Sequence, residues 1–218
     1  TSSSQLRLCL LPQFQGNALI GKSSVMVAEV DEYQNKLQYF QPQGVLLNNI
    51  DYDHPDFFKT NGYIGRGISG QTSYQFLLRF REDVINLSPA LVVINAGTND
   101  VAENTGAYNE DTFGNIASMA ELAKANKIKV ILTSVLPAAE FPWRREIKDA
   151  PQKIQSLNAR IEAYAKANKI PFVNYYQPMV VGENKALNPQ YTKDGVHPTG
   201  EGYDIMEALI KQAIEKAL

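Results

Sequence analysis

The chain has 218 residues, 44% of them hydrophobic, which suffices for one sizeable α/β domain with its own core. Its 21 Lys and Arg residues and 23 Asp and Glu residues give a net charge of −2, so charge gives no argument for binding nucleic acid or an anionic membrane. Cys9 is the only cysteine, which excludes an intramolecular disulfide and a cysteine-rich metal site. The two histidines, His54 and His197, are far apart in the sequence and argue against a histidine-based zinc site.

The N-terminal segment gives little evidence of targeting. No apolar run reaches the roughly 18 residues that a bilayer-spanning helix needs, so we expect no membrane span. Residues 6–12 (LRLCLLP) have a faint export-signal character, but they lack an initiator methionine and a clear small-residue cleavage site. An ordinary N-terminal strand or a disordered lead fits them better.

From residue 63 onward, strand and helix patterns alternate along the chain. Apolar runs predict strands over 63–68, 91–95, 129–136 and 171–175. Apolar residues at helical spacing predict four helices, marked by Phe76, Leu77, Phe80 and Val84, by Phe113, Ile116, Ala120 and Ala123, by Ile154, Leu157, Ile161 and Tyr164, and by Met206, Leu209, Ile210 and Ala213.

A short repeat marks two predicted helix-to-strand joints. The hexapeptide AKANKI occurs at residues 123–128 and again at 165–170. Asparagine tolerates the left-handed conformation that ends many helices, and lysine suits the negative end of the helix dipole. We therefore expect both copies to end a helix, with Asn126 and Asn168 as the left-handed residues.

This alternation predicts the α/β class, with one doubly wound, mostly parallel sheet and helices on both faces. The first strand is less legible and lies at 36–40 or at 44–47. No linker separates a second domain, so we expect a single domain over residues 1–218. In such sheets ligands bind beyond the carboxyl ends of the strands, which is where the loops 67–70, 97–100 and 136–151 fall.

The segment Asp194-Gly195-Val196-His197 predicts a catalytic base. A tight turn can bring the Asp194 carboxylate back to the imidazole of His197, where it accepts the N–H and fixes the tautomer. The other ring nitrogen is then available as a general base. Asp-Gly is also ordinary turn chemistry, so a purely structural turn is the alternative.

A second candidate follows the apolar strand 91–95. Asn99 can aim its side-chain amide into a crevice at the end of that strand, although asparagine is also a common helix cap. We expect Asp100 to hold the loop rather than to react. Ser69 and Ser73 lie close by in sequence and read as loop or cap serines rather than nucleophiles.

In three segments the chain resembles the SGNH (GDSL-like) esterase and lipase superfamily. GISGQTS at 67–73 is similar to the family's second block, GTND at 97–100 matches its third, and DGVHP at 194–198 matches its fifth. The resemblance covers about residues 54–218 and implies a flavodoxin-like three-layer sandwich. It assigns Gly70 and Asn99 to an oxyanion hole, His197 to the general base and Asp194 to the orientation of that base.

The first block of the family, Gly-Asp-Ser at the end of the first strand, is missing. The best position is VLLNNI at 45–50, which has Asn48 and Asn49 in place of Gly-Asp and no serine. The other candidate is LIGKSS at 19–24, which carries Ser23 and Ser24 but has a lysine in place of the aspartate.

Three explanations of this gap stay open. The nucleophile is Ser23 or Ser24 on a rearranged loop, the chain is a non-catalytic relative, or its N-terminal quarter is altered relative to a natural parent. In the predicted site Ser23 takes the place of the nucleophile.

The resemblance implies a serine-type esterase that hydrolyses a carboxylic ester through an acyl-enzyme, without a metal or a cofactor. The expected partner is a small-molecule ester, with a short acyl group, an acetylated sugar or a lysophospholipid. Trp143 is a candidate wall for that substrate, and a packing role suits it equally. The rival hypothesis is an inactive binding protein of the same fold. A flavodoxin-like nucleotide-binding domain is a weaker third, since no phosphate-cradling loop is found. The resemblance is compatible with a secreted or periplasmic protein.

Overall fold

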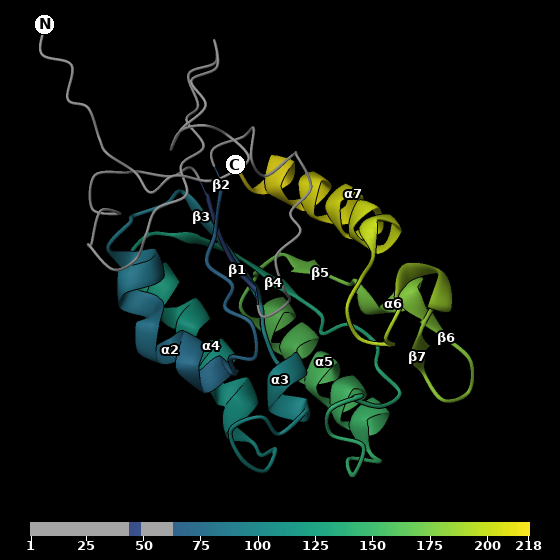
Figure 1. The fold of residues 1–218 in the computed structure, drawn as a ribbon. Coiled ribbons are helices and arrows are strands. Elements are labelled where there is room, and N and C mark those ends of the chain that lie inside the picture. The colour runs from purple at the N-terminus through teal and green to yellow at the C-terminus, as the bar shows by residue number, and fades with distance from the viewer. Residues whose placement is uncertain (1–43, 49–62) are drawn as a thin grey trace, which may run out of the picture.

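A five-stranded parallel sheet forms the centre of the computed structural model, which describes residues 44–48 and 63–218 (Figure 1). Every neighbouring pair of strands is parallel. The prediction of one parallel sheet is therefore confirmed, and the first described strand is the candidate at 44–47. The alternative at 36–40 lies outside the described residues. The strands, in the spatial order β2-β1-β3-β4-β5, are β1 (Gly44–Asn48), β2 (Tyr63–Gly65), β3 (Leu91–Asn95), β4 (Lys129–Thr133) and β5 (Phe172–Val173).

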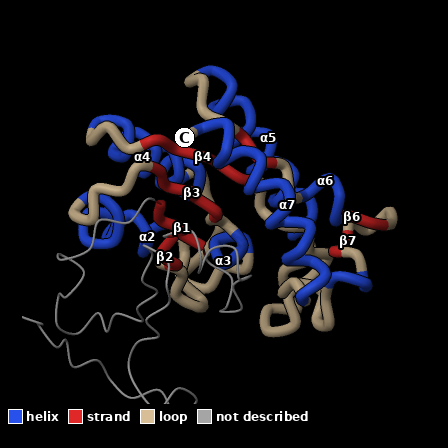
Figure 2. Tube along the Cα trace, turned by 90° about the horizontal axis from the view of Figure 1, so that it is seen from above, coloured by secondary structure: helices blue, strands red, loops and turns tan. Residues whose placement is uncertain are grey.

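Helices cover both faces of this sheet, as the ribbon in Figure 1 and the tube in Figure 2 show. Successive residues of a strand point to opposite faces. Val92 and Ile94 belong to the larger core cluster, which includes buried residues of three longer helices, whereas Leu91 and Val93 pack with the last helix. The three helices are α2 (Ser73–Phe80), α4 (Asp111–Ala125) and α5 (Ala150–Ala167), and the last one is α7 (Gly200–Ala217).

The first predicted helix changes character before its end. The α-helical turns of α2 stop at Phe80, and a wider π-helical segment, η3 (Arg81–Ile85), follows. In this segment the side chain of Asp83 is buried and forms ion pairs with Arg66 and Arg79. The wider turn thus carries a paired charge inside the fold next to the buried Val84.

Three strands are shorter than the sequence pattern predicts, among them β5, which covers only Phe172–Val173 of the predicted 171–175. β4 ends at Thr133 instead of residue 136, because the backbone of Val135 bonds to a side chain rather than to a strand. The Val135 N–H donates to Asn158 Oδ1 at 2.7 Å, and Asn158 Nδ2 donates to the Val135 carbonyl at 3.0 Å. β2 ends at Gly65, and the next carbonyl, that of Arg66, accepts from Arg79 Nη2 at 2.7 Å.

The two AKANKI copies do end helices α4 and α5, but the prediction of left-handed asparagines is wrong. Asn126 and Asn168 have φ of −96° and −97°, and the following lysines, Lys127 and Lys169, take the left-handed conformation with φ of 62° and 55°. The right-handed asparagines gain a hydrogen bond, since their side-chain amides donate to the carbonyl four residues earlier at 2.8 and 3.0 Å. The lysine backbone therefore closes each helix.

Shorter elements complete the described fold. None of the described helices is long and apolar enough to cross a membrane. The single domain over 1–218 stays a prediction. The remaining elements are α3 (Thr98–Val101), α6 (Tyr176–Met179), β6 (Val180–Val181), β7 (Ala186–Leu187) and η4 (Pro189–Tyr191), with β6 and β7 forming a small antiparallel pair.

Candidate active site

The strand order places a topological switch point at the carboxyl edge of the sheet. In the order β2-β1-β3-β4-β5, the chain changes direction across the sheet between β1 and β3, and ligands bind at such a switch point. Asn48 and Asn95, the last residues of β1 and β3, are paired in register at this edge. The carboxyl ends of β1 and β3 therefore lie side by side.

A glycine controls the turn after β3. Gly97 has φ of 125°, and a Cβ added there would lie 2.7 Å from Leu157 Cδ2 and 2.9 Å from Val135 Cγ2. Only glycine fits both the conformation and the space. The turn leads directly into α3, which begins at Thr98 and carries Asn99 and Asp100.

The predicted Asp194–His197 turn forms as the sequence indicates. Asp194 Oδ2 lies 2.5 Å from His197 Nδ1, while Asp194 Oδ1 accepts the backbone N–H groups of Val196 at 2.9 Å and of His197 at 2.8 Å. The Thr192 hydroxyl also donates to Oδ1, at 3.2 Å. One carboxylate therefore orders both the turn and the ring, and the contact at Nδ1 leaves Nε2 as the basic atom of a neutral imidazole.

The turn also sets the charge of Asp194. Partial burial by itself raises the pKa of the carboxyl group. The hydrogen bonds from the His197 ring, from the His197 and Val196 backbones, and the charge of His197 outweigh it and lower the pKa to about 2. Asp194 is therefore an anion at neutral pH, as a carboxylate that orients a base must be.

Asp100, in α3, connects this helix to the start of α2 at Ser73. The buried carboxylate of Asp100 accepts the Ser73 backbone N–H at 2.9 Å and the Ser73 hydroxyl at 2.5 Å. Burial raises the pKa of Asp100, against the lowering by these bonds from Ser73. Ser73 is the first residue of α2 and Ser69 lies in the exposed turn before it. These contacts agree with the structural roles predicted for Asp100 and Ser73.

The side chain of Asn99 is buried between two loops. Its Nδ2 donates to the Gln71 carbonyl at 3.0 Å, and its Oδ1 accepts from Asn104 Nδ2 at 3.0 Å. Gly70, just before Gln71, has φ of 76°. Asn99 in α3 and Gly70 in the loop before α2, the two predicted oxyanion donors, therefore lie in adjoining segments although they are far apart in sequence.

The sequence analysis missed Asn104, which contacts three predicted site residues. Its Nδ2 donates to the Gly70 carbonyl at 3.3 Å as well as to Asn99, and its Oδ1 accepts from Trp143 Nε1 at 3.1 Å. Asn104 follows α3 in a turn and belongs to no motif, so only the tertiary contacts identify it.

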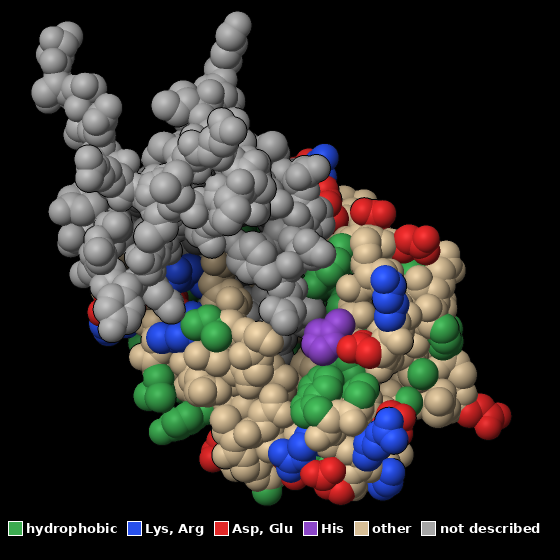
Figure 3. Space-filling model, viewed as in Figure 1, with side chains coloured by type: hydrophobic (Ala, Val, Ile, Leu, Met, Phe, Trp, Pro, Cys, Tyr) green, Lys and Arg blue, Asp and Glu red, His purple; other side chains and the backbone are tan. Residues whose placement is uncertain are grey.

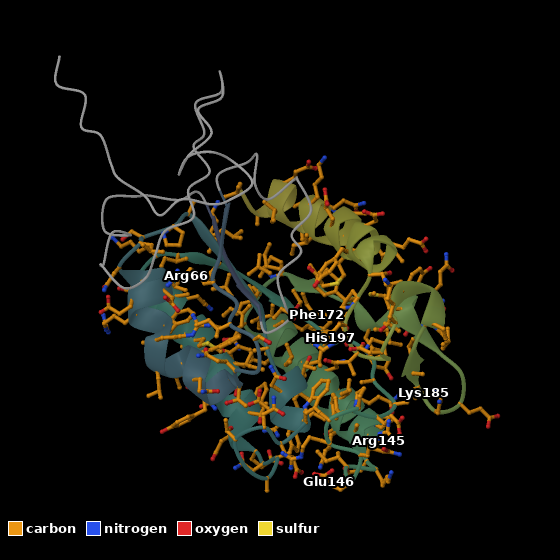
Figure 4. The ribbon with its side chains drawn as sticks, viewed as in Figure 1. Arg66, Arg145, Glu146, Phe172, Lys185 and His197 are labelled. Carbon is orange, nitrogen blue, oxygen red and sulfur yellow. The ribbon has the colours of Figure 1, made fainter. Side chains whose placement is uncertain are left out.

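Trp143 extends this chain of contacts to the base. Its ring centroid lies 5.7 Å from that of His197 and 5.5 Å from that of the buried Phe141, and Trp143 itself is 42% exposed. In Figure 3 the histidine, in purple, lies at the surface beside acidic atoms and above a group of hydrophobic side chains. Figure 4 shows His197 on the segment before α7, above the loop that carries Arg145 and Glu146.

Comparison with known proteins identifies the family. Residues 45–205 match the GDSL-like Lipase/Acylhydrolase family. The chain belongs to this family. The resemblance noted from the three motifs is thus confirmed, and family membership supports ester hydrolysis as the general reaction.

Solved structures are similar over most of the chain. A GDSL-like lipase from Bacteroides thetaiotaomicron is 86% identical, with 85% of this chain and 97% of that one covered and a TM-score of 0.82. A putative acylhydrolase from Bacteroides fragilis is 67% identical, with coverage of 86% and 99% and a TM-score of 0.80. An acetylxylan esterase from Geobacillus stearothermophilus, at 18% identity, covers 80% of this chain and 94% of its own with a TM-score of 0.63, and shows the shared fold.

A curated protein matches the chain over a shorter stretch. The chain is 43% identical over 47 residues to the UDP-N-acetylmuramate–L-alanine ligase of Thermosynechococcus vestitus. This match spans 22% of the chain and 10% of the ligase. It is too short to carry the activity of the ligase to this GDSL-like chain.

The described structure thus links Gly70, Asn99, Trp143 and His197 through direct contacts, and places Asp194 on His197. The candidates for the first block fall elsewhere. Ser23 and Ser24 lie outside the described residues, as do residues 49–50 and His54. Within the described residues there is no group of three or more His, Cys, Asp or Glu side chains that could hold a metal ion. The catalytic roles of the named residues remain proposals.

Proposed function

We propose that this GDSL-like chain is a serine-type esterase that hydrolyses a small carboxylic ester through an acyl-enzyme. The observation that carries the proposal is the Asp194–His197 pair, with 2.5 Å between Oδ2 and Nδ1. A carboxylate in this position keeps the proton on Nδ1 and stabilises the imidazolium that forms when Nε2 accepts a proton. A turn with no chemical role does not need an anionic partner on the imidazole.

His197 acts first as a base and then as an acid. Nε2 removes the proton of the serine hydroxyl as the serine oxygen forms a bond to the ester carbonyl carbon. The imidazolium returns that proton to the alcohol oxygen when the C–O bond breaks. Water, activated by the same nitrogen, then releases the acid and restores the serine.

Gly70 and Asn99 stabilise the negative charge that develops on the carbonyl oxygen. No hydrogen-bond acceptor for the Gly70 N–H occurs among the described residues, so this donor suits an oxyanion, together with the amide of Asn99 and the N–H of the nucleophile. Such donors are effective because they are held in place before charge develops. The buried contacts of Asn99 provide this preorganisation.

A short acyl ester is the substrate that we favour. Trp143 offers an exposed aromatic face next to His197, where the alcohol portion of an ester can pack. An acetylated sugar or another small acetyl ester fits this single aromatic face better than a long-chain lipid. A lysophospholipid is the less favoured alternative.

Fluorophosphonate labelling with peptide mapping tests the proposal. The reagent phosphonylates only a serine activated by a base, so we expect an adduct on one serine in the wild-type chain and none in His197→Ala. Parallel assays with p-nitrophenyl acetate measure turnover. An adduct on Ser23 or Ser24 identifies the nucleophile. Absence of both labelling and turnover overturns the esterase and favours the inactive relative, as the missing Gly-Asp-Ser block suggests. An adduct on Ser69 or Ser73 contradicts the assignment of the nucleophile to the first block.

A further inference from the structure

We propose that Asn104 is a positioning residue of the oxyanion hole. Asn104 sets the orientation of the Asn99 amide, and it connects the oxyanion hole to the base through its contact with Trp143. This inference rests on the proposed function for its catalytic consequence. The structural part of the inference, that Asn104 fixes the orientation of Asn99, does not depend on esterase activity.

The hydrogen bonds of Asn104 define one orientation of its own amide. A primary amide has two N–H donors and a carbonyl acceptor. Both acceptors near Nδ2 are oxygens, the Gly70 carbonyl at 3.3 Å and Asn99 Oδ1 at 3.0 Å, whereas Oδ1 faces the donor Trp143 Nε1 at 3.1 Å. Turning the amide over would place oxygen against two oxygens and N–H against N–H. All three contacts would become repulsive.

This fixed amide in turn fixes Asn99. Because Asn104 donates to Asn99 Oδ1, the Asn99 NH₂ group must lie on the opposite side, where one N–H reaches the Gln71 carbonyl at 3.0 Å. An overturned Asn99 would present its oxygen to the site and would repel an oxyanion instead of binding it. Asn104 therefore selects the one orientation of Asn99 that has catalytic value.

The backbone around Asn104 is itself anchored. The Asn104 N–H donates to the Asn99 carbonyl at 3.1 Å, which closes the turn after α3. The preceding residue, Glu103, accepts from Lys153 Nζ at 2.9 Å through its side chain and from Arg144 Nη1 at 2.7 Å through its carbonyl. Contacts from α5 and from the loop that carries Trp143 thus fix the backbone next to Asn104, so that Asn104 can hold Asn99 in place.

The same residue connects the two halves of the site. Trp143 bonds to Asn104 by its indole N–H and contacts the His197 ring by its face. The path from Gly70 through Asn104 and Trp143 to His197 consists of direct contacts only. A substitution of Asn104 should therefore change the contacts of the oxyanion hole and the position of Trp143 beside the base.

The first test reads the orientation of Asn99 without any need for turnover. In ¹⁵N-labelled protein, the side-chain NH₂ signals of Asn99 are identified by their loss in Asn99→Ala, and their hydrogen exchange is then followed in Asn104→Ala. We expect exchange about fivefold faster or more, since a lost hydrogen bond removes about 1 kcal/mol. Asn86→Ala, which removes only a bond to Glu82 at the surface, is the matched control. Unchanged exchange in Asn104→Ala overturns the proposal even if the chain has no esterase activity.

The second test is a double-mutant cycle on ester hydrolysis. Asn104→Ala should lower kcat by about 10–100-fold with little change in KM, part of the effect of losing an oxyanion donor. In an Asn99→Ala background the same substitution should cost less than about threefold, because the residue through which it acts is gone. A merely structural role predicts equal effects in both backgrounds, and that result would overturn the proposal. Absence of turnover in the wild type counts against the esterase alone, and the exchange experiment then decides the role of Asn104.

Discussion

The base side and the oxyanion side of the site are built in different ways. Asp194 and His197 are three residues apart and are joined in one turn, with side chains that remain 40% and 44% exposed. Asn99 is buried, and its side chain is bonded to Gln71, which is 28 residues away in the sequence. Asn104 bonds to Gly70 across 34 residues. The base is thus encoded locally, whereas the hole depends on the assembled fold.

This difference suits the two chemical tasks. A base must exchange protons with the substrate and with water, so partial exposure does no harm and one carboxylate suffices to orient it. An oxyanion hole works only if its donors are already in place, since reorganisation during the reaction would consume the stabilisation. Burial and contacts from several loops supply that rigidity.

Loss of the base should have the largest effect. His197→Ala removes the atom that carries the proton in both half-reactions, so we expect kcat for p-nitrophenyl acetate to fall by several orders of magnitude. Initial-rate assays measure the change, with Asn86→Ala, an exposed residue at the end of η3, as a surface control. Full activity in His197→Ala would end the esterase hypothesis, whatever the oxyanion side does.

Loss of the buried donor should cost less. Asn99→Ala is expected to lower kcat by about 10²–10³-fold with a small change in KM, because the donor acts mainly on the charge of the transition state. Separate determination of kcat and KM gives the result. An effect confined to KM would mean that Asn99 binds the ground state of the substrate, and the contrast between base and hole would fail.

The contrast also explains how far the sequence could predict this molecule. The alternating apolar patterns were sufficient for the parallel sheet and its helices, and DGVHP was sufficient for the Asp194–His197 turn, because each depends on neighbours in the chain. Asn104 could not be predicted, since its partners meet only after three loops assemble. The lysines that close α4 and α5 were missed for a related reason: propensity favours asparagine in the left-handed position, but a local side-chain bond holds it elsewhere. The nucleophile stays a prediction outside the described residues.

Substitution of Asp100, next to Asn99, should lower the stability of the fold. Asp100→Ala deprives the buried Ser73 N–H and hydroxyl of their acceptor, so we expect the free energy of unfolding to fall by about 2–3 kcal/mol. Urea denaturation measures it, and Asp111→Ala, at an exposed carboxylate in the first turn of α4, is the control. Equal stabilities of the two variants would show that the loop is not held by Asp100.

The smallest effect is expected at the exposed carboxylate of the base side. The pKa of Asp194 is lowered from the ordinary 3.8 to about 2 in the folded chain, so its ionised form stabilises the fold above about pH 3.8. This stabilisation is lost as the pH falls through about 2. Because the side chain is 40% exposed, solvent screening limits the contribution to about 1 kcal/mol or less. Asp194→Asn should therefore be slightly less stable than the wild type at pH 7, and the difference should vanish toward pH 2.

Urea denaturation at several pH values measures this difference in stability, with Asp204→Asn on the exposed side of α7 as the control. A difference that persists unchanged to pH 2 would mean that the turn depends on the shape of Asp194 rather than on its charge, and that the base side is as structural as the hole.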